Sequence, residues 1–393
     1  MSGEKRIYDP LYNYITLSLP DELAVVDTQP VQRLRRINQL GLSPIVYPAG
    51  NHSRFEHSLG VMHLAGEMAE SLGLNDDEVE AYRLAGLLHD IGHPPYSHSL
   101  EPVMEERMGI SHEEHTCRII DQIEETLPVE GNWLKRIIQG ESKYDIVAGV
   151  MDVDRLDYLN RDAYHTGLPY GVNSSETVIE FAKLHNDEIV FEGQARRALR
   201  QVLKARMNMS YSVYQHHTAK IVELMLQRSV ERVLDHQDTT HTIWDVVEMD
   251  DYRLHTFLLD HNYITGNLYE LIAHRKPFKR SVMVNGFDVS EEMMRTLANR
   301  TENARKLERE IAAEVGIESN NVLVDTPELP PAKRETVNIV GNRGEIVDLN
   351  SVSKFAESIE EAEWENTSFG IYTPKEHTEK VNKTAQKLLL PDI

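Results

Sequence analysis

The sequence predicts a mainly α-helical protein with a small α+β lobe at its C-terminal end. Apolar residues recur at helical spacing from about residue 58 to 270, and glycine and proline residues separate the stretches. After about residue 275 the pattern changes to short alternating apolar runs with turn signals. The length of 393 residues has room for two domains, which we expect over residues 1–275 and 276–393.

Apolar stripes define the expected helices. Two stripes repeat at three- and four-residue steps, Val61, Ala65, Met68 and Leu72 in one and Leu84, Leu87, Leu88 and Ile91 in the other. A third pattern predicts one long helix from about residue 200 to 235. A short strand pair is expected near residues 188–192.

The C-terminal lobe is expected to mix strands and helices. Alternating apolar residues that end at Asn-Gly or Gly-rich turns favour hairpins. The elements expected there are a hairpin at 282–286, a charged helix from about 290, a loop at 327–331, a hairpin over 337–347, a strand at 369–372 and a polar helix over 374–390.

Charge and cysteine content exclude several classes of protein. Lys and Arg number 41 against 64 Asp and Glu, so the formal net charge is −23. Such a surface repels nucleic acid and anionic lipid, and we expect neither as a partner. The single cysteine, Cys117, excludes an intramolecular disulfide and fits a reducing compartment. With no signal peptide or long apolar run visible, we expect a cytoplasmic protein.

Histidines gather in one short segment that suggests metal chemistry. Residues 89–115 contain five of them, and an apolar helix ends there in His89-Asp90 before Gly92. Imidazole and carboxylate together suit a borderline divalent metal such as Mn, Fe, Zn or Ni. Two adjacent side chains at a helix end can flank one ion. The alternative is a buried histidine beside an aspartate that the helix dipole disfavours.

Two further segments can complete such a site. Residues 54–60 lead into an amphipathic helix and supply His57. Asp154, Tyr158 and Asp162 recur at four-residue steps, which places them on one helix face, and arginines flank them. Carboxylate, guanidinium and phenol on one helix suit metal, phosphate and sugar together. A solvated charged face is the alternative.

The order His57, His89-Asp90, Asp154 resembles that of the HD-domain metal-dependent phosphohydrolases. The segments around these residues, together with residues 27–41, resemble the deoxynucleoside triphosphate (dNTP) triphosphohydrolases of that superfamily over about residues 5–280, without a sterile alpha motif. The resemblance implies an HD-domain helical core. It also implies one divalent metal per active site (Mn, Fe, Zn, Ni or Mg) on His57, His89, Asp90 and Asp154, with a second Mg in some members.

The same resemblance implies that water attacks the α-phosphorus of a dNTP and releases a deoxynucleoside and tripolyphosphate. His98 matches the candidate proton donor to the leaving 5′-oxygen. The residues assigned by resemblance to catalysis and its supporting network are Asp90, His93, His98, Glu101, His112 and Glu113. Those assigned to substrate binding are Gln39, Leu40, Arg54, Arg155, Tyr158, Asp162, Arg206, Tyr214 and Gln215.

The resemblance further implies a homo-oligomer, dimer or tetramer, and a nucleotide activator that contacts Asp27, Gln32 and Arg35. For this segment the alternative is a polar helix face that follows a helix N-cap. Two other functions stay open. One is an HD-family phosphohydrolase that acts on another nucleotide or phosphoester. The other is a nucleotide-sensing or nucleic-acid-binding scaffold with an inactive metal site.

Overall fold

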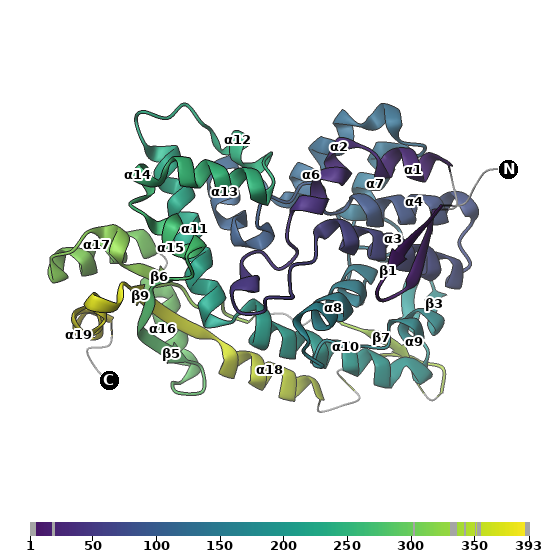
Figure 1. The fold of residues 1–393 in the computed structure, drawn as a ribbon. Helices are drawn as coiled ribbons and strands as arrows, with labels where there is room; N and C mark the ends of the chain where they lie inside the picture. The colour runs from purple at the N-terminus through teal and green to yellow at the C-terminus, as the bar shows by residue number, and fades with distance from the viewer. Residues whose placement is uncertain are drawn as a thin grey trace. The chain divides into compact units, whose positions relative to one another are not determined.

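The computed structural model describes residues 5–17, 20–301, 303–330, 336–341, 343–349, 351 and 355–389. These residues form a mainly α-helical fold with a few small sheets, which confirms the expected fold class (Figure 1). The chain divides into two compact units. The first contains residues 1–210, 241–255 and 335–354, and the second contains 211–240, 256–334 and 355–393. A domain boundary after residue 275 stays a prediction.

The first unit is largely helical. Its helices are α1 (Pro20–Val26), α2 (Gln29–Arg33), α3 (Arg54–Ser71), α4 (Asp76–Leu88), α5 (Glu101–Met108), α6 (His112–Gln122), α7 (Gly131–Ile138), α8 (Val153–Thr166), α9 (Ser175–Glu180), α10 (Arg196–Met209) and α12 (Ile243–Val247). Helix α3 packs against both α4 and α8. The members of the predicted stripes that lie within α3 and α4 are buried, because they form the faces through which these helices pack. Leu72 and Ile91 lie just beyond the ends of these helices, and Leu72 is half-buried.

Capping residues explain where the central helices begin. The backbone N–H of Ser53 donates to Glu56 at the start of α3. Asn75 and Glu78 form a reciprocal capping box at the start of α4. The side chain of Asp152 accepts from the backbone N–H of Arg155 and so caps α8. Each cap satisfies N–H groups that a helix start would otherwise leave without a partner.

Small sheets complete the first unit. An N-terminal antiparallel pair joins β1 (Lys5–Asp9) and β2 (Asn13–Leu17). A second sheet has the order β3 (Ala182–His185), β4 (Glu188–Phe191), β7 (Asn338–Val340) and β8 (Ile346–Asp348). The strand pair near 188–192 and the hairpin over 337–347 are thereby confirmed. The hairpin pairs in parallel with β4 and so belongs to the first unit, not to the C-terminal lobe.

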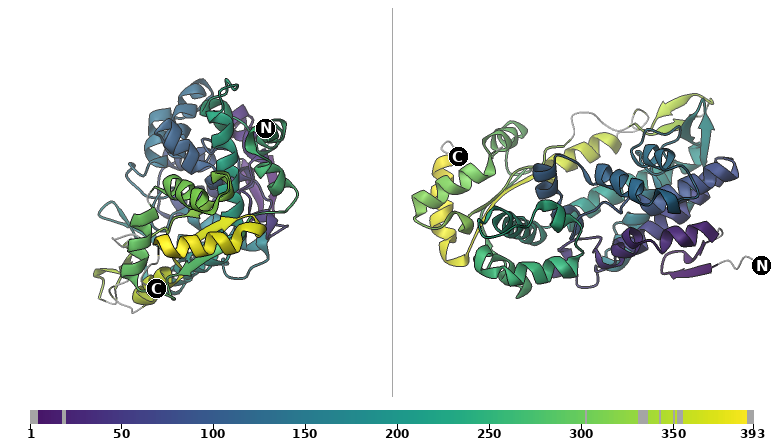
Figure 2. Two further views of the ribbon diagram at one scale, coloured as in Figure 1. Left: turned by 90° about the vertical axis from the view of Figure 1, so that its left-hand side faces the viewer. Right: turned by 90° about the horizontal axis from the view of Figure 1, so that it is seen from above.

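The second unit combines helices with a three-stranded antiparallel sheet (Figure 2). Its strands run in the order β5 (Lys279–Asn285), β9 (Ser368–Thr373), β6 (Leu323–Asp325). Its helices are α11 (His217–Asp235), α14 (Asn262–Thr265), α15 (Leu268–Ala273), α16 (Glu291–Thr301), α17 (Ala304–Val315), α18 (Phe355–Asn366) and α19 (Thr378–Leu389). Helix α13 (Asp251–Asp260) contains the boundary between the units.

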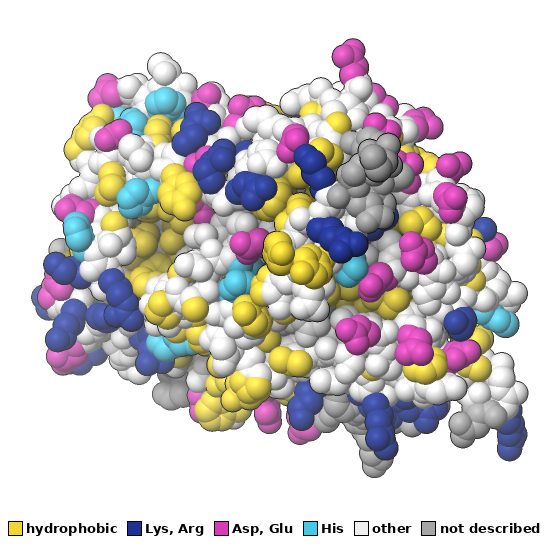
Figure 3. All heavy atoms as spheres, turned by 45° about the vertical axis from the view of Figure 1, so that its right-hand side comes forward, with side chains coloured by type: hydrophobic (Ala, Val, Ile, Leu, Met, Phe, Trp, Pro, Cys, Tyr) yellow, Lys and Arg dark blue, Asp and Glu magenta, His cyan; other side chains and the backbone are white. Residues whose placement is uncertain are grey.

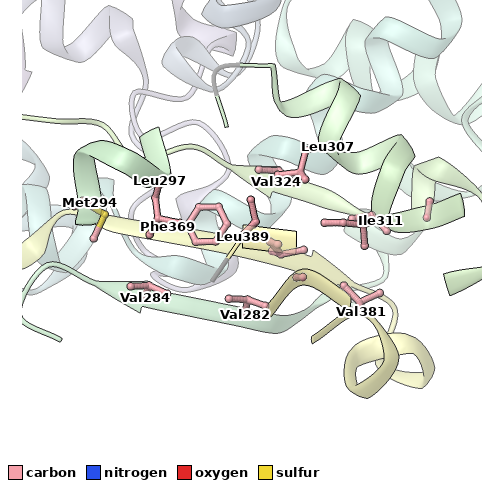
Figure 4. Close-up of a cluster of buried hydrophobic side chains, with 14 residues drawn as sticks. Val282, Val284, Met294, Leu297, Leu307, Ile311, Val324, Phe369, Val381 and Leu389 are labelled. Carbon is pink, nitrogen blue, oxygen red and sulfur yellow. The ribbon is translucent and has the colours of Figure 1, made fainter. Parts of the chain in front are cut away.

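An apolar core holds the sheet of the second unit to its helices. Val282 and Val284 of β5, Phe369 of β9 and Ile311 of α17 point toward one another (Figure 4). Val381 of α19 joins the same cluster. Each Å² of apolar surface buried in such a cluster stabilises the fold by about 25 cal/mol.

Two sequence expectations are wrong in detail. Residues 282–286 form no hairpin, because β5 pairs with the distant strand β9, with Val284 opposite Phe369. The expected long helix over 200–235 is two helices, α10 and α11, separated by the π-helical turn Ser210–Tyr214. The apolar period continues across that turn, so periodicity alone does not show the break.

The strand at 369–372 and the helices near 290 and 374–390 are confirmed by β9, α16 and α19. Residues 327–330 lie outside helices and strands, as expected, and residue 331 lies outside the described part of the chain. Among the residues that the structure describes, we find no helix that is both long and apolar enough to cross a membrane.

Candidate active site

The four candidate metal ligands converge in the first unit. His57 comes from α3, His89 and Asp90 follow the end of α4, and Asp154 lies in the first turn of α8. His57 Nε2 lies 2.9 Å from Asp154 Oδ1, and His89 Nε2 lies 3.3 Å from Asp90 Oδ1 and 3.6 Å from Asp154 Oδ1. Ligand atoms of His57, His89 and Asp90 lie within 4.8 Å of one another. The structure therefore brings the predicted set together.

Close packing of α3 against α8 makes this convergence possible. A Cβ atom at Gly60 would overlap Asp157 Oδ1 and lie 2.5 Å from Arg161 Nη2. Glycine at this position therefore lets the buried ion pair of α8 lie directly against α3. His57, one helical turn before Gly60, is thereby carried to Asp154.

Contacts on the far side of each histidine ring orient the two imidazoles. His57 Nδ1 donates to Asp157 Oδ2 at 2.8 Å, and His89 Nδ1 donates to the carbonyl oxygen of Gly86 at 2.8 Å. These bonds place the ring proton on Nδ1 in both residues and leave Nε2 as the ligand atom. The carboxylate of Asp157 also accepts from Arg161 and from the hydroxyl of Tyr12.

Asp157 was not identified from the sequence as a site residue. The available signal was its position, three residues after Asp154 and four before Arg161, which places the three on neighbouring parts of one helix face. That pattern alone does not distinguish a support for a metal ligand from an ordinary ion pair.

The electrostatics keep the carboxylates of the site ionised. Burial alone would raise the pKa of Asp90, but Arg54 and His89 hold that pKa well below its usual range. Burial would also raise the pKa of Asp154, but the neighbouring imidazoles of His57 and His89 lower it. Burial would lower the pKa of His57, but Asp154 and Asp157 raise it to about 10. The pocket is thus built to attract a cation.

The residues present fit a divalent metal. His89 Nε2 is buried and makes no hydrogen bond to the described residues, although it faces the carboxylates of Asp90 and Asp154. Two imidazoles and two carboxylates form a donor set that borderline divalent ions such as Mn, Fe, Zn or Ni prefer. His57, His89, Asp90 and Asp154 are the residues that would hold the ion.

A second histidine–carboxylate group lies directly beside the first. His93 Nε2 lies 3.2 Å from Asp90 Oδ1, and its Nδ1 lies 3.1 Å from Glu101 Oε1. Glu101 also contacts His112 Nδ1 at 2.5 Å and His98 Nδ1 at 2.6 Å. The predicted catalytic residues therefore form one connected network from the candidate metal ligand Asp90 to His98, whose side chain is 66% exposed.

The pKa values of His93 and His112 in this network are shifted in opposite directions. Burial lowers the pKa of His93 to about 4, with Arg54 and His112 adding to the effect. Burial opposes the shift at His112, but the Glu101 carboxylate raises its pKa. Glu113, also predicted, lies 3.3 Å from His112 Nε2. The buried His93 is thus neutral at physiological pH, while His112 favours the protonated form.

Arg54 reaches the metal pocket from within the protein. It is 2% exposed, and its Nη1 donates to Asp90 Oδ2 at 2.6 Å while its Nε donates to Ser97 Oγ at 2.6 Å. The buried Nη2 atom has no hydrogen-bond partner among the described residues. Arg155 follows Asp154 on α8, is 8% exposed and donates to the carbonyl oxygen of Val150.

The remaining predicted substrate residues are distributed over both units. Asp162 Oδ1 lies 2.8 Å from Nε2 of His52, whose carbonyl oxygen accepts from the backbone N–H of Gln39. Tyr158 lies between Asp154 and Asp162 on α8, and burial raises the pKa of its hydroxyl to about 12.

Leu40 is buried in the first unit, and Arg206 is on α10 of the same unit. Tyr214 and Gln215 belong to the second unit, so their role stays a prediction.

The predicted activator residues lie near one another at the surface of the first unit. Gln32 Nε2 donates to the carbonyl oxygen of Val26, and Arg35 Nε donates to Gln32 Oε1 at 2.8 Å. Arg35 stacks over the ring of Phe55, and Asp27 is exposed after the end of α1. Whether these residues bind a nucleotide stays a prediction.

Comparison with known families decides the identity of this fold. Residues 54–250 match the family model of the HD domain, and residues 175–391 match that of the HD associated region. The chain belongs to the HD-domain phosphohydrolase family. The HD-domain match contains His57, His89, Asp90 and Asp154, the residues that converge in the structure.

Relatives extend the likeness along most of the chain. An uncharacterized protein of Methanocaldococcus jannaschii is 32% identical over 98% of this chain and 82% of its own length. Human SAMHD1, named a deoxynucleoside triphosphate triphosphohydrolase, is 30% identical over 60% of this chain and 46% of its own length. This chain therefore spans about half of the length of human SAMHD1.

Solved structures share the fold. A hypothetical protein from Aquifex aeolicus superposes with a TM-score of 0.77 at 28% identity, covering 97% of this chain and all of its own. A structure described as a phosphohydrolase from Bacteroides thetaiotaomicron gives the same TM-score at 25% identity, covering 94% of this chain and all of its own.

Proposed function

We propose that this HD-domain protein is a metal-dependent dNTP triphosphohydrolase, which converts a dNTP and water to a deoxynucleoside and tripolyphosphate. The observation that carries the proposal is the position of the candidate metal-binding residues next to the network of His93, Glu101 and His98. The similarity of 60% of this chain to human SAMHD1, the enzyme named for this activity, supports the same substrate class.

The chain's own residues supply distinct parts of the reaction. A divalent cation, when bound, supplies Lewis acidity that activates water and neutralises phosphate charge. Arg54 keeps Asp90 ionised and oriented, and its Nη2 atom is the part of the guanidinium left for a phosphate oxygen. Arg155, next to Asp154 on α8, is the second guanidinium that we assign to the phosphates.

Protonation of the leaving 5′-oxygen falls to the histidine network. The side chain of His98 is exposed, and the carboxylate of Glu101 accepts from its Nδ1 atom and fixes the ring. An imidazole placed in this way can deliver a proton in the transition state. Glu101 also links His98 to His93 and His112, which orient the carboxylate in turn.

The local positive charge must overcome the charge of the whole chain. The net charge of −23 opposes the approach of a triphosphate. On the face drawn in Figure 3, acidic side chains are dispersed among basic ones. Attraction for phosphate therefore depends on the cation and the two arginines, so we expect strong metal dependence of substrate affinity.

Product analysis tests the proposal. The protein, loaded with Mn²⁺, is incubated with each dNTP alone and in pairs, and nucleoside, mono- and diphosphates are separated from inorganic products. We expect deoxynucleoside and tripolyphosphate. Stimulation by a second nucleotide would support the activator site at Asp27, Gln32 and Arg35, and light scattering with and without nucleotide would test oligomer formation.

Isotope labelling locates the bond that breaks. If water attacks the α-phosphorus, solvent ¹⁸O enters tripolyphosphate and not the nucleoside. Monophosphate with pyrophosphate would show that the bridge between the α- and β-phosphates breaks instead of the bond to the 5′-oxygen, and would contradict the proposal. Absence of turnover with every dNTP and metal would also reject it, and would leave other phosphoesters or a nucleotide-sensing scaffold as the function to test.

A further inference from the structure

The loop at residues 93–98 carries two histidines of the network but has an unfavourable backbone. Tyr96 and Ser97 have φ angles of 58° and 56°, in the left-handed region that residues other than glycine rarely adopt. Each such residue costs on the order of 1 kcal/mol or more and persists only where surrounding structure holds it. The contacts that hold this loop therefore control where His93 and His98 point.

Asp251 provides one of these contacts from a distant part of the chain. The residue lies at the start of α13, within the first unit, and is 5% exposed. Its Oδ1 atom accepts from the backbone N–H of Tyr96 at 2.7 Å, and its Oδ2 atom accepts from the backbone N–H of Asn38 at 2.9 Å. One carboxylate thus fixes the loop at its first left-handed residue.

Arg33 provides the other contact. It is 6% exposed, and its Nη2 atom donates to the carbonyl oxygen of His93 at 3.0 Å. Its Nε atom donates to the carbonyl oxygen of Met249 at 2.9 Å, two residues before Asp251. The guanidinium therefore connects the beginning of the histidine loop to the segment that leads into Asp251.

Neither side chain is placed to act on substrate. The Nε and Nη2 atoms of Arg33 and both carboxylate oxygens of Asp251 are used in backbone contacts with residues 38, 93, 96, 247 and 249. A guanidinium that joins several carbonyl oxygens has no equivalent in lysine, whose ammonium is a single point charge. A carboxylate that accepts two N–H groups has no full equivalent in asparagine, which offers one oxygen.

We propose that Arg33 and Asp251 are positioning residues that hold loop 93–98 in the conformation in which His93 and His98 serve catalysis. Arg33 and Asp251, with their contacts to the loop, form what we call the clamp. The catalytic part of the proposal rests on the proposed function, whereas the clamp does not. The two parts therefore need separate measurements: amide hydrogen exchange for the clamp and steady-state kinetics for its catalytic consequence.

The variants are Asp251→Ala, Asp251→Asn and Arg33→Lys, with Asp250→Asn as the matched control. Asp250 neighbours Asp251 and caps α13 through the N–H of Arg253, but its other oxygen pairs with Arg36 instead of the loop. Asparagine at 250 keeps an acceptor for the cap. All variants are compared as Mn²⁺-loaded, full-length protein, with bound Mn²⁺ and thermal unfolding measured for each.

In the exchange experiment, we expect peptides covering residues 93–100 to exchange at least tenfold faster in Asp251→Ala and Arg33→Lys and at the normal rate in Asp250→Asn. In the kinetic experiment, we expect kcat for the dNTP to fall at least tenfold in the same two variants, with KM and bound Mn²⁺ nearly unchanged. Asp251→Asn should lie between wild type and Asp251→Ala in both.

Several results would overturn the inference. Normal exchange of the loop in folded Asp251→Asn and Arg33→Lys would remove the clamp. Faster exchange of the loop with unchanged kcat would show that the clamp has no catalytic role. Equally fast exchange and an equal fall of kcat in Asp250→Asn would show that any change in this segment disturbs the loop. If Asp251→Ala does not fold, the Asp251→Asn and Arg33→Lys pair decides. If wild type hydrolyses no dNTP, the proposed function fails while the exchange data still decide the clamp.

Discussion

His57 Nδ1 and Asp157 Oδ2 lie 2.8 Å apart, on the side of the imidazole opposite Asp154. The carboxylate thereby fixes the tautomer of a candidate metal ligand without belonging to the candidate donor set itself. Such outer contacts raise the basicity of the ligand nitrogen and restrict ring rotation. Metal affinity in this HD-domain protein is thus expected to depend on a residue that the ion does not touch.

Replacement of Asp157 by asparagine should weaken Mn²⁺ binding by about 10–100-fold, the usual effect of losing an outer partner of a metal ligand. Titration calorimetry measures the affinity. Asp9→Asn is the matched control, because Asp9 pairs with the same Arg161 but does not contact His57. An equal loss of affinity in Asp9→Asn would assign the effect to the ion pair and not to His57.

Replacement of Asp154 by alanine should abolish turnover and reduce bound metal to background. The reason is that Asp154 faces both imidazoles and is the ligand contributed by α8. Metal analysis and circular dichroism are measured on the same sample, with helical content expected to stay intact. Asp121→Ala, which removes an exposed carboxylate paired with Lys135, should retain both metal and activity. Full activity in Asp154→Ala would reject this ligand assignment.

Replacement of Gly60 by alanine should lower the free energy of unfolding by about 1–3 kcal/mol, the usual cost of overpacking a core. The added Cβ atom would overlap the Asp157 carboxylate and force α3 away from α8. Urea denaturation measures the change. Gly193→Ala is the control, since a Cβ there meets, among the described residues, only the carbonyl oxygen of Val340 at 3.5 Å and should change stability by less than about 0.5 kcal/mol.

The stability of the protein should depend on pH through Asp251. Burial raises the pKa of this carboxyl to about 7 in the folded protein, against about 3.9 in the unfolded chain. Between these values the folded state binds more protons. The free energy of unfolding therefore decreases as the pH rises from about 4 to 7, by up to about 1.4 kcal/mol per pH unit from this group.

Asp251→Asn should remove this slope, so its stability relative to wild type should improve as the pH rises from 4 to 7. This difference in stability is measured from denaturation midpoints at several pH values, converted to free energies of unfolding. Arg36 and the Arg253 N–H outweigh burial and lower the pKa of Asp250, so Asp250→Asn should show no such trend in that range. Parallel pH curves for wild type and Asp251→Asn would contradict the prediction.

The sequence predicted those features that local periodicity and short motifs determine. The stripe through Val61 and Met68 anticipated α3, and the order of His57, His89 and Asp154 anticipated a set of side chains that do meet. The helices that carry these residues can be read from three- and four-residue spacing, whereas the ligand set itself is what the resemblance to the HD-domain family implies.

Features that depend on distant pairing were missed or misassigned. Val284 pairs across the sheet with Phe369 and not with a neighbouring hairpin strand. Asp157 supports His57 only because α8 packs on α3, and Asp251 reaches Tyr96 from far along the chain. Spacing within one element contains no information about such partners, because they are set by how elements pack.

The parallel pairing of β4 with β7, seen as Phe191 opposite Ile339, has a consequence for biosynthesis. The ribosome releases β4 long before β7, and most of the second unit's sequence emerges between them. The four-stranded sheet of the first unit cannot form completely until that whole stretch has been synthesised. The edge of β4 that pairs with β7 therefore has no partner strand during that part of translation. Nascent chains arrested before residue 335 should therefore expose an unpaired strand edge, a surface that chaperones recognise and that favours aggregation.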